Sequence, residues 1–178
     1  MLKRRNLLAI LVTIGGLSLP VHAAVDLPDP VRASVPDLRL LGSGRMTWFG
    51  LHLYDVALWT PRRSFAFSDA FALAIRYTRN LRGERIAQRS AAEIERLGVA
   101  DAAQVARWEV EMLRIFPDVD AGEKLTGVYL PGQGAEFFYQ NQFIGRIADP
   151  EFGRAFFSIW LDPRTREPEL RERLTGQR

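Results

Sequence analysis

The sequence predicts an α+β domain, in which strands and helices form separate blocks. Segments with the two-residue apolar alternation of strands come first, segments with helical spacing follow, and the same order is then repeated. The stretch 42–59, GSGRMTWFGLHLYDVALW, is apolar on both faces when it is read as a strand. A strand of this kind needs cover on both faces, from helices or from a second layer.

The strands are predicted from their alternation. Residues 71–77, FALAIRY, alternate most cleanly, with Arg76 on the side opposite Phe71 and Tyr77. Residues 46–59 read as one strand, with Phe49, Leu51 and Leu53 on one face and Met46, Trp48, His52, Tyr54 and Val56 on the other. The remaining strands are KLTGVYLP (124–131), AEFFYQ (135–140) and FIGRI (143–147), with QNQ (140–142) as a hairpin turn.

The helices are predicted from apolar stripes and from the residues that begin and end them. Gly98 ends the first, Asp101 and Pro117 bound the second, and Asp149-Pro150 begins the third, which is the best marked. The expected helical ranges are 83–97, from Asp101 to Pro117, from Asp149 to Asp162-Pro163, and a short tail over 167–174.

The N-terminus has the pattern of a secretory signal peptide. Three basic residues precede an apolar run from Leu7 to Leu19, and small residues stand at the −3 and −1 positions of a cleavage site after Ala23. The run is too short to span a membrane. We therefore expect a signal peptide over 1–23, an N-terminal leader over 24–35 read as a strand or linker, and one domain over 36–176. The expected location is the periplasm, with no stable membrane anchor after cleavage.

Charge and cysteine content exclude several classes of partner and cofactor. Removing residues 1–23, which hold three basic and no acidic side chains, leaves 21 basic side chains against 21 acidic ones. A chain without a basic excess does not predict nucleic-acid binding. There is no cysteine, so neither disulfides nor thiolate ligands are available. We expect no metal site and no cofactor.

The sequence offers little for hydrolytic or metal chemistry. His52 is the only histidine after residue 23, and no G-x-S-x-G motif accompanies it, so we interpret His52 as a hydrogen-bonded core residue. DVDAGE (118–123) lacks the spacing of a calcium loop and PGQGAE (131–136) lacks the context of a phosphate loop. Both are predicted to be turns.

Arg45 and Thr47 are the more informative polar residues. Arg45 opens the apolar strand, and a guanidinium beside an apolar cavity can bind a carboxylate through two hydrogen bonds. The Thr47 hydroxyl could polarise a carbonyl. The alternative from the residues alone is a solvated arginine and a threonine chosen for its strand propensity.

Three stretches carry a family resemblance: LLGSGRMTWFGLHLYDVALW, GVYLPGQGAEFFYQNQFIGRIADPEFGRAFFSIWLD and LRERLTG. With these stretches, over about residues 36–176, the chain resembles the chalcone isomerase-like family, and most closely its bacterial, exported branch. The resemblance implies an open-faced β-sandwich, with a large antiparallel sheet covered by helices and a cleft between them. Plant members of the family close a flavanone ring, and plastid members bind fatty acids through an arginine.

The resemblance transfers the plant active site only in part. It places Thr47 at the position of the catalytic threonine, whereas Arg45 lies too close to Thr47 to match the essential arginine. Arg85, Gln88 and Arg89 stand where the plant enzymes carry a tyrosine and an asparagine. We therefore do not expect true chalcone isomerase activity.

Three functions remain open at this point. The first is a non-catalytic binder of a small apolar, fatty-acid-like ligand, with Arg45 as carboxylate anchor, Thr47 as a second donor, and Trp48, Phe49 and Tyr54 as walls, according to which sheet face forms the cleft. The second is an isomerase or lyase of an unknown carbonyl substrate, with Thr47 as the candidate catalytic residue. The third is an interaction domain whose core is filled by large side chains.

Overall fold

The computed structural model describes residues 25–177, so the expected signal peptide lies outside the described residues. The six strands pair with their sequence neighbours in one antiparallel sheet, in the order β1-β2-β3-β4-β5-β6. The α+β class is confirmed. The strands are β1 (Arg39–Trp48), β2 (Leu51–Thr60), β3 (Phe71–Tyr77), β4 (Lys124–Leu130), β5 (Gly134–Tyr139) and β6 (Gln142–Ile147).

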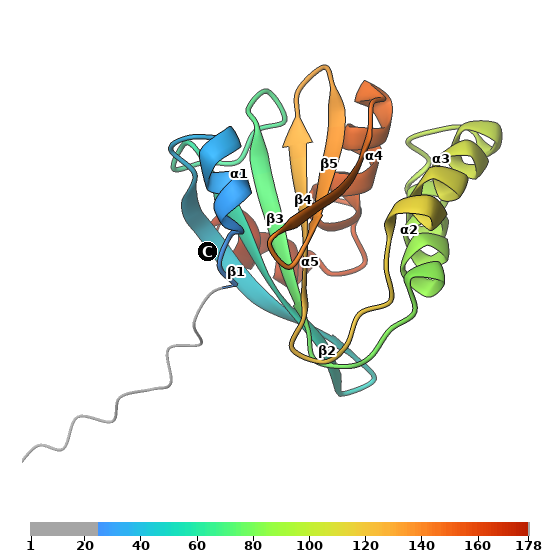
Figure 1. Cartoon of the computed structure of the whole chain (residues 1–178), viewed down its shortest axis with the longest axis horizontal. Helices are drawn as coiled ribbons and strands as arrows, with labels where there is room; N and C mark the ends of the chain where they lie inside the picture. The colour runs from blue at the N-terminus through green and yellow to red at the C-terminus, as the bar shows by residue number, and fades with distance from the viewer. Residues whose placement is uncertain (1–24, 178) are drawn as a thin grey trace, which may run out of the picture.

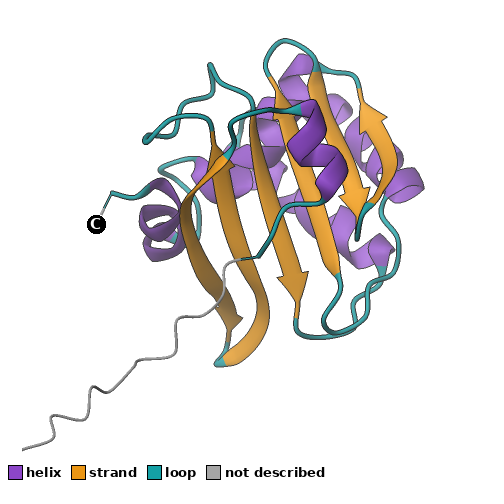
Figure 2. Ribbon diagram, turned by 60° about the vertical axis from the view of Figure 1, so that its left-hand side comes forward, coloured by secondary structure: helices purple, strands orange, loops and turns teal. Residues whose placement is uncertain are grey.

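The sheet separates two apolar layers of unequal size (Figures 1 and 2). The larger layer lies against four helices, which are α2 (Gly83–Leu97), α3 (Ala102–Ile115), α4 (Pro150–Leu161) and α5 (Pro168–Thr175). We call this side of the sheet the helix face. The other side, which we call the open face, is covered only in part by the N-terminal segment and α1 (Asp29–Ser34).

The helix face is packed mainly with aromatic rings. Phe71, Leu73, Ile75 and Tyr77 of β3 all point to it, while Ala72 and Ala74 point to the open face, so the alternation predicted for FALAIRY is confirmed. The rings of Phe71 and Phe157 meet edge to face, with centroids 5.0 Å apart. Such contacts add to the free energy already gained by burying the rings.

The stretch 42–59 is not one strand, as predicted, but a hairpin. β1 ends at Trp48, β2 begins at Leu51, and Phe49 and Gly50 form the turn with φ angles of 47° and 76°. Positive φ at both central residues is the rule for hairpin turns of type I′, which usually carry Asn-Gly. A register shift beside Thr47 further changes the alternation, so the predicted assignment of residues to two faces of one strand is wrong around the turn.

The segment read as a leader strand or linker contains helix α1. Pro30 stands in its first turn, where proline costs no hydrogen bond. Val25, Leu27 and Val31 are buried against the open face, and the Trp59 indole N–H donates a 3.1 Å hydrogen bond to the carbonyl of Val25. This segment is therefore packed as part of the domain.

The other helices begin and end close to the predicted residues. Asp101 caps α3 by accepting a hydrogen bond from the Gln104 N–H, and Gly98 ends α2 in the left-handed conformation. Asp149 caps α4 through the N–H groups of Glu151 and Phe152. Its second carboxylate oxygen accepts a 2.8 Å hydrogen bond from the buried Trp108 indole, which ties α3 to the start of α4.

The glycines of GSG have a packing role. A Cβ added to Gly42 would lie 2.0 Å from the Arg173 carbonyl oxygen, and one added to Gly44 would lie 2.4 Å from a methyl carbon of Leu170. The two missing side chains therefore let α5 lie directly on β1 at the edge of the sheet.

Candidate functional site

The polar groups of interest form two sets, one on each face of the sheet, and each set includes one of two neighbouring residues of β2. Tyr54 points to the helix face, and Asp55 points to the open face, as successive residues of a strand do. We call the helix-face group, Met46, Tyr54, Tyr77, Ile86 and Trp160, the Tyr54 site. We call the open-face group, Arg45, His52, Asp55 and Arg76, the Asp55 cluster.

In the Tyr54 site two tyrosines lie side by side on adjacent strands. Tyr54 pairs with Tyr77 in the β2–β3 register, and their ring centroids are 5.9 Å apart. The Trp160 indole N–H of α4 donates a 3.0 Å hydrogen bond to the Tyr54 hydroxyl oxygen. Tyr77 is 4% exposed, whereas Met46, Ile86 and Trp160 are only partly buried. The site therefore lies at the edge of the apolar layer of the helix face, partly buried and partly at the surface.

Both hydroxyls keep an O–H that no described residue accepts. The Tyr54 oxygen accepts from Trp160, which leaves its own proton free to donate, and no hydrogen bond to the Tyr77 hydroxyl is found among residues 25–177. Burial raises the pKa of Tyr54 to about 12, and burial raises the pKa of Tyr77 well above its ordinary value. Both groups are therefore neutral hydrogen-bond donors at physiological pH.

Three charged residues act on Tyr54, namely Glu167, Glu93 and Arg89, and of these Glu93 and Arg89 are paired with each other. Glu93 of α2 is buried and lies 2.7 Å from Arg96, 3.1 Å from Arg89 and 3.2 Å from Arg166. Glu93 and Arg89 act on the pKa of Tyr54 in opposite directions. Glu93 therefore already has three guanidinium partners.

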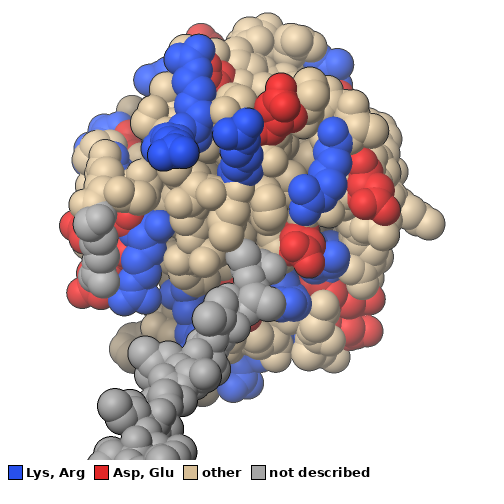
Figure 3. Space-filling model, turned by 90° about the vertical axis from the view of Figure 1, so that its left-hand side faces the viewer, with Lys and Arg blue, Asp and Glu red and all other residues tan. Residues whose placement is uncertain are grey.

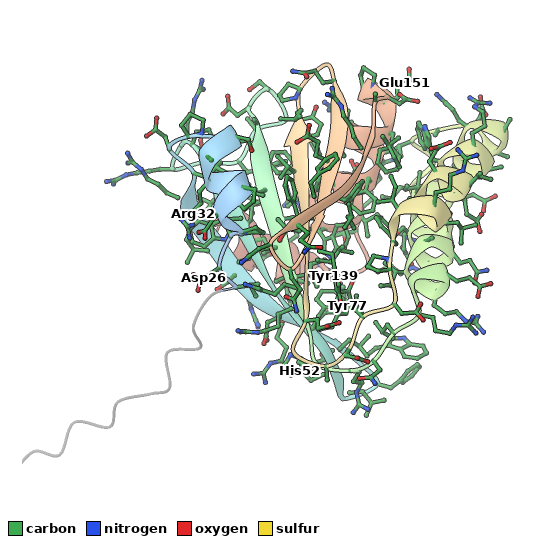
Figure 4. All side chains as sticks on the ribbon, in the orientation of Figure 1. Asp26, Arg32, His52, Tyr77, Tyr139 and Glu151 are labelled. Carbon is green, nitrogen blue, oxygen red and sulfur yellow. The ribbon has the colours of Figure 1, made fainter. Side chains whose placement is uncertain are left out.

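The Asp55 cluster brings three cationic or titratable groups to one carboxylate. The Asp55 oxygens lie 3.0 Å from His52 Nε2, 3.7 Å from Arg45 Nε and 3.8 Å from an Arg76 nitrogen. His52 lies low on the hairpin, close to its turn (Figure 4). It is hydrogen-bonded, as predicted, but it is partly exposed and does not belong to the core.

The structure separates the five residues predicted to form one binding site. Arg45 lies in the Asp55 cluster on the open face, whereas Tyr54 lies on the helix face. Thr47 is exposed and pairs with His52. Trp48 and Phe49 lie at the hairpin turn, 54% and 87% exposed. The structure therefore does not bring these residues together around one small molecule.

Sequence reasoning missed every member of the Tyr54 site except Tyr54 itself, and Tyr77 and Trp160 are the two polar ones among them. Tyr77 was recognisable as an inward residue of FALAIRY, but its pairing with Tyr54 depends on the strand register. Trp160 was recognisable as part of the apolar stripe of its helix, but its contact with Tyr54 depends on how α4 crosses the sheet.

The other motifs behave as turns. Asp118 accepts a hydrogen bond from the Gly83 N–H, and Glu123 accepts from the Asp120 N–H, so DVDAGE connects α3 to β4. Residues 131–133 connect β4 to β5. Within residues 25–177 no group of three or more His, Cys, Asp and Glu side chains could hold a metal ion.

An open groove lies on another part of the surface, between α3 and β6. Its volume is about 430 Å³, and its walls include Arg107, Trp108, Glu111, Arg146 and Asp149. Charges of both signs line it, and Asp149 already engages the Trp108 N–H. Over the different face drawn in Figure 3, basic and acidic side chains are likewise interspersed.

Comparison with known proteins decides the family. A family profile described as chalcone isomerase-like matches residues 21–176. The chain belongs to the chalcone isomerase-like family. A search of curated proteins gives no match.

The structure of this chalcone isomerase-like protein is similar to a crystal structure of a fatty-acid binding protein of Arabidopsis thaliana. The TM-score is 0.60 at 10% sequence identity, and the match covers 80% of this chain and 88% of the other. The open-faced sandwich, with a large antiparallel sheet covered by helices, is thereby confirmed. Within residues 25–177 no helix is long and apolar enough to cross a membrane.

Proposed function

We propose that this protein is a non-catalytic binding protein for a small apolar molecule with an oxygen-bearing end, such as a fatty acid. The ligand's oxygen atoms would accept hydrogen bonds from Tyr54 and Tyr77, and its apolar part would lie against Met46, Ile86 and Trp160. Ligand sites of this kind are largely apolar, with a few polar groups that fix orientation.

The observation that carries the proposal is the pair of neighbouring hydroxyls on the helix face. Each has an O–H that no described residue accepts, and each is protonated near neutral pH, as tyrosine ordinarily is, with burial raising its pKa further. A hydroxyl whose proton has no acceptor within the protein can donate it to a ligand oxygen. The two donors are held by adjacent strands, so they are positioned before a ligand arrives.

The same geometry favours binding over catalysis. A general base must be able to take a proton near neutral pH, and the raised pKa values of Tyr54 and Tyr77 make both tyrosines donors instead. Glu93, a buried carboxylate that acts on Tyr54, is paired with three arginines. Thr47, the candidate for isomerase or lyase chemistry, is exposed and lies away from the tyrosines.

The fatty-acid binding protein of the same fold makes fatty acids the first ligands to test. At 10% identity this likeness concerns the fold, so the choice of ligand class is part of the proposal. That Arg45 anchors the ligand carboxylate stays a prediction. Comparing the ligand affinity of Arg45→Ala with that of Tyr54→Phe tests it. Because the two residues lie on opposite faces of the sheet, one small ligand would depend on only one of them.

We also propose that the protein is exported to the periplasm after cleavage following Ala23, as in the bacterial, exported branch that it resembles. The support is the basic, apolar and small-residue pattern of residues 1–23. N-terminal sequencing of the protein from a periplasmic fraction should begin at Ala24. Recovery of the full chain from the cytoplasm would contradict export.

Native mass spectrometry tests the proposed function. The protein is purified from its own host, and any bound molecule is extracted and identified. A stoichiometric organic acid, or a mass shift on adding dodecanoic acid, supports the binding protein. The aromatic packing of the helix face favours one alternative, an interaction domain with a filled core. An unshifted mass with every fatty acid and flavonoid tried would support that alternative.

A further inference from the structure

The turn of the β1–β2 hairpin exposes a cluster of apolar side chains. Trp48, Phe49 and Leu51 are 54%, 87% and 47% exposed, and the Trp48 and Phe49 rings meet edge to face at 4.9 Å. Among the described residues, these are three of the eight exposed large hydrophobics. The other five lie at the far end of β1, on α3, on β6 and in the α2–α3 connection, whereas these three lie within four consecutive residues. A cluster of this kind marks a contact surface.

The backbone of the turn supports the same conclusion independently. Phe49 has a φ of 47°, and bulky residues rarely adopt this left-handed conformation, in which hairpin turns usually carry asparagine. The Phe49 ring contacts Trp48, its neighbour at the turn, but is almost fully exposed, so burial of the ring does not compensate the strain. Strain that the rest of the domain does not explain points to a function of the side chain outside it.

The charges beside the turn indicate what it contacts. The open face of the hairpin carries Arg45, with Arg76 on β3, and the Arg79 guanidinium donates a 3.3 Å hydrogen bond to the carbonyl of His52. Arg45 and Arg76 each lie within 3.8 Å of Asp55, so with Arg79 three guanidinium groups stand on this part of the hairpin and its neighbouring strand. Arg45 precedes Trp48 by three residues, or about 10 Å along a strand. Apolar side chains in a membrane interface lie about 5–10 Å deep, so Arg45 would reach the phosphate level.

We propose that this hairpin docks the protein reversibly on an anionic lipid bilayer, with Trp48, Phe49 and Leu51 inserted in the interface and the arginines against lipid phosphates. Tryptophan beside a cationic group is the combination that membrane interfaces favour. The inference goes beyond the proposed function, because it concerns a separate surface and requires no bound fatty acid.

Vesicle flotation tests the inference. Two chains are used, the full chain and a chain beginning at Ala24, which retains the apolar layers on both faces of the sheet. Each is mixed with phosphatidylcholine vesicles with or without about 30% phosphatidylglycerol. Both chains should float with the anionic vesicles, less with the neutral ones, and less at about 0.5 M salt. Phe49→Asn should weaken binding by about tenfold or more without lowering Tm, because it removes a large apolar group and suits the turn.

Two further variants separate the contributions. Arg79→Gln should weaken binding to anionic vesicles several-fold and leave binding to neutral ones unchanged. Phe143→Asn is the matched control, since Phe143 is 56% exposed on β6, away from the hairpin, and this variant should bind as the wild type does.

Three results would overturn the inference: a chain from Ala24 that stays unbound, Phe49→Asn that binds like the wild type, or Phe143→Asn that loses as much. A dimer that Phe49→Asn dissociates, with no vesicle binding, would instead assign the turn to a second copy of the chain. Affinity for dodecanoic acid should be the same in Phe49→Asn and in the wild type, so this test is distinct from that of the proposed function.

Discussion

The Trp160 indole donates a hydrogen bond to the Tyr54 hydroxyl across 106 positions of sequence, and this bond joins α4 to the second strand of the sheet. It also determines what Tyr54 can do. With a lone pair of its oxygen engaged, the Tyr54 hydroxyl keeps its proton to donate, and Tyr77, whose hydroxyl has no hydrogen-bond partner among residues 25–177, pairs with it on the neighbouring strand. The same contact thus contributes to packing and to the proposed ligand site.

Replacement of Tyr54 by phenylalanine should have a small structural effect and a larger functional one. Tyr54→Phe leaves the partly buried Trp160 N–H without its acceptor, which we expect to cost about 1 kcal/mol in the free energy of unfolding. Loss of a hydrogen bond to a charged acceptor should weaken dodecanoic acid binding by about tenfold. Urea unfolding and titration calorimetry measure the two effects. A loss of more than about 3 kcal/mol would indicate a mainly structural role.

The tyrosines should ionise at a higher pH than free tyrosine does. All four have a pKa raised above the ordinary value: burial is the main cause for Tyr54, Tyr77 and Tyr129, and the hydrogen bond to Glu123 is the main cause for Tyr139. A raised folded-state pKa adds stability below the ordinary pKa, and this stability is lost as pH rises through the folded value. For Tyr54 the window is from about 10 to about 12.

Ultraviolet titration of phenolate checks this expectation. We expect little ionisation until the pH exceeds about 10, followed by ionisation together with unfolding. In Tyr54→Phe one phenolate should be missing from the late part of the curve. Early ionisation of a tyrosine that Tyr54→Phe abolishes would contradict the neutral donor assigned to this residue.

The glycine at the start of GSG should be intolerant of any side chain. Gly42→Ala places a Cβ 2.0 Å from the Arg173 carbonyl, and backbone cannot move aside as a side chain can. We expect a loss of at least about 3 kcal/mol, since overpacking of this severity forces α5 away from β1. Ser43→Ala, at the exposed neighbouring position, should change stability by less than about 0.5 kcal/mol. Equal urea midpoints for the two variants would contradict this packing.

Asp149 should show two separable contributions. Asp149→Ala removes the cap of α4 and the acceptor of the buried Trp108 N–H, so we expect a loss of about 2–4 kcal/mol. Asp149→Asn can keep the capping oxygen but loses one acceptor, and should cost about half as much. If both variants unfold at the same urea concentration, the cap of α4 contributes little beyond the tie to Trp108.

The sequence predicted those parts of the fold whose signals are local. Asp101 and Asp149 each stand directly before an apolar stripe and cap a helix in the structure, and Gly98 ends one. The alternation of FALAIRY likewise reports on its own residues. These signals depend on hydrogen bonds and burial within a few positions, which is why the sequence carries them.

The missed features depend on competing or distant effects. The turn at Phe49-Gly50 lacks the usual asparagine, and both strands beside it are apolar, so the hairpin resembled one long strand. Two prolines concealed α1, although Pro30 suits a first turn. The Tyr54 site could not be assembled from sequence, because Tyr77 reaches it by strand register and Trp160 by the crossing of α4.

The dissociation constant of dodecanoic acid for three variants tests the central claim most directly. Calorimetry should show weaker binding by more than about tenfold when Tyr54→Phe and Tyr77→Phe are combined, because two hydrogen bonds to the ligand are lost. Tyr129→Phe makes the same chemical change elsewhere on the helix face and should bind as the wild type does, as should Arg45→Ala. An unchanged constant in the double variant, or a loss confined to Arg45→Ala, would contradict a ligand site at Tyr54 and Tyr77.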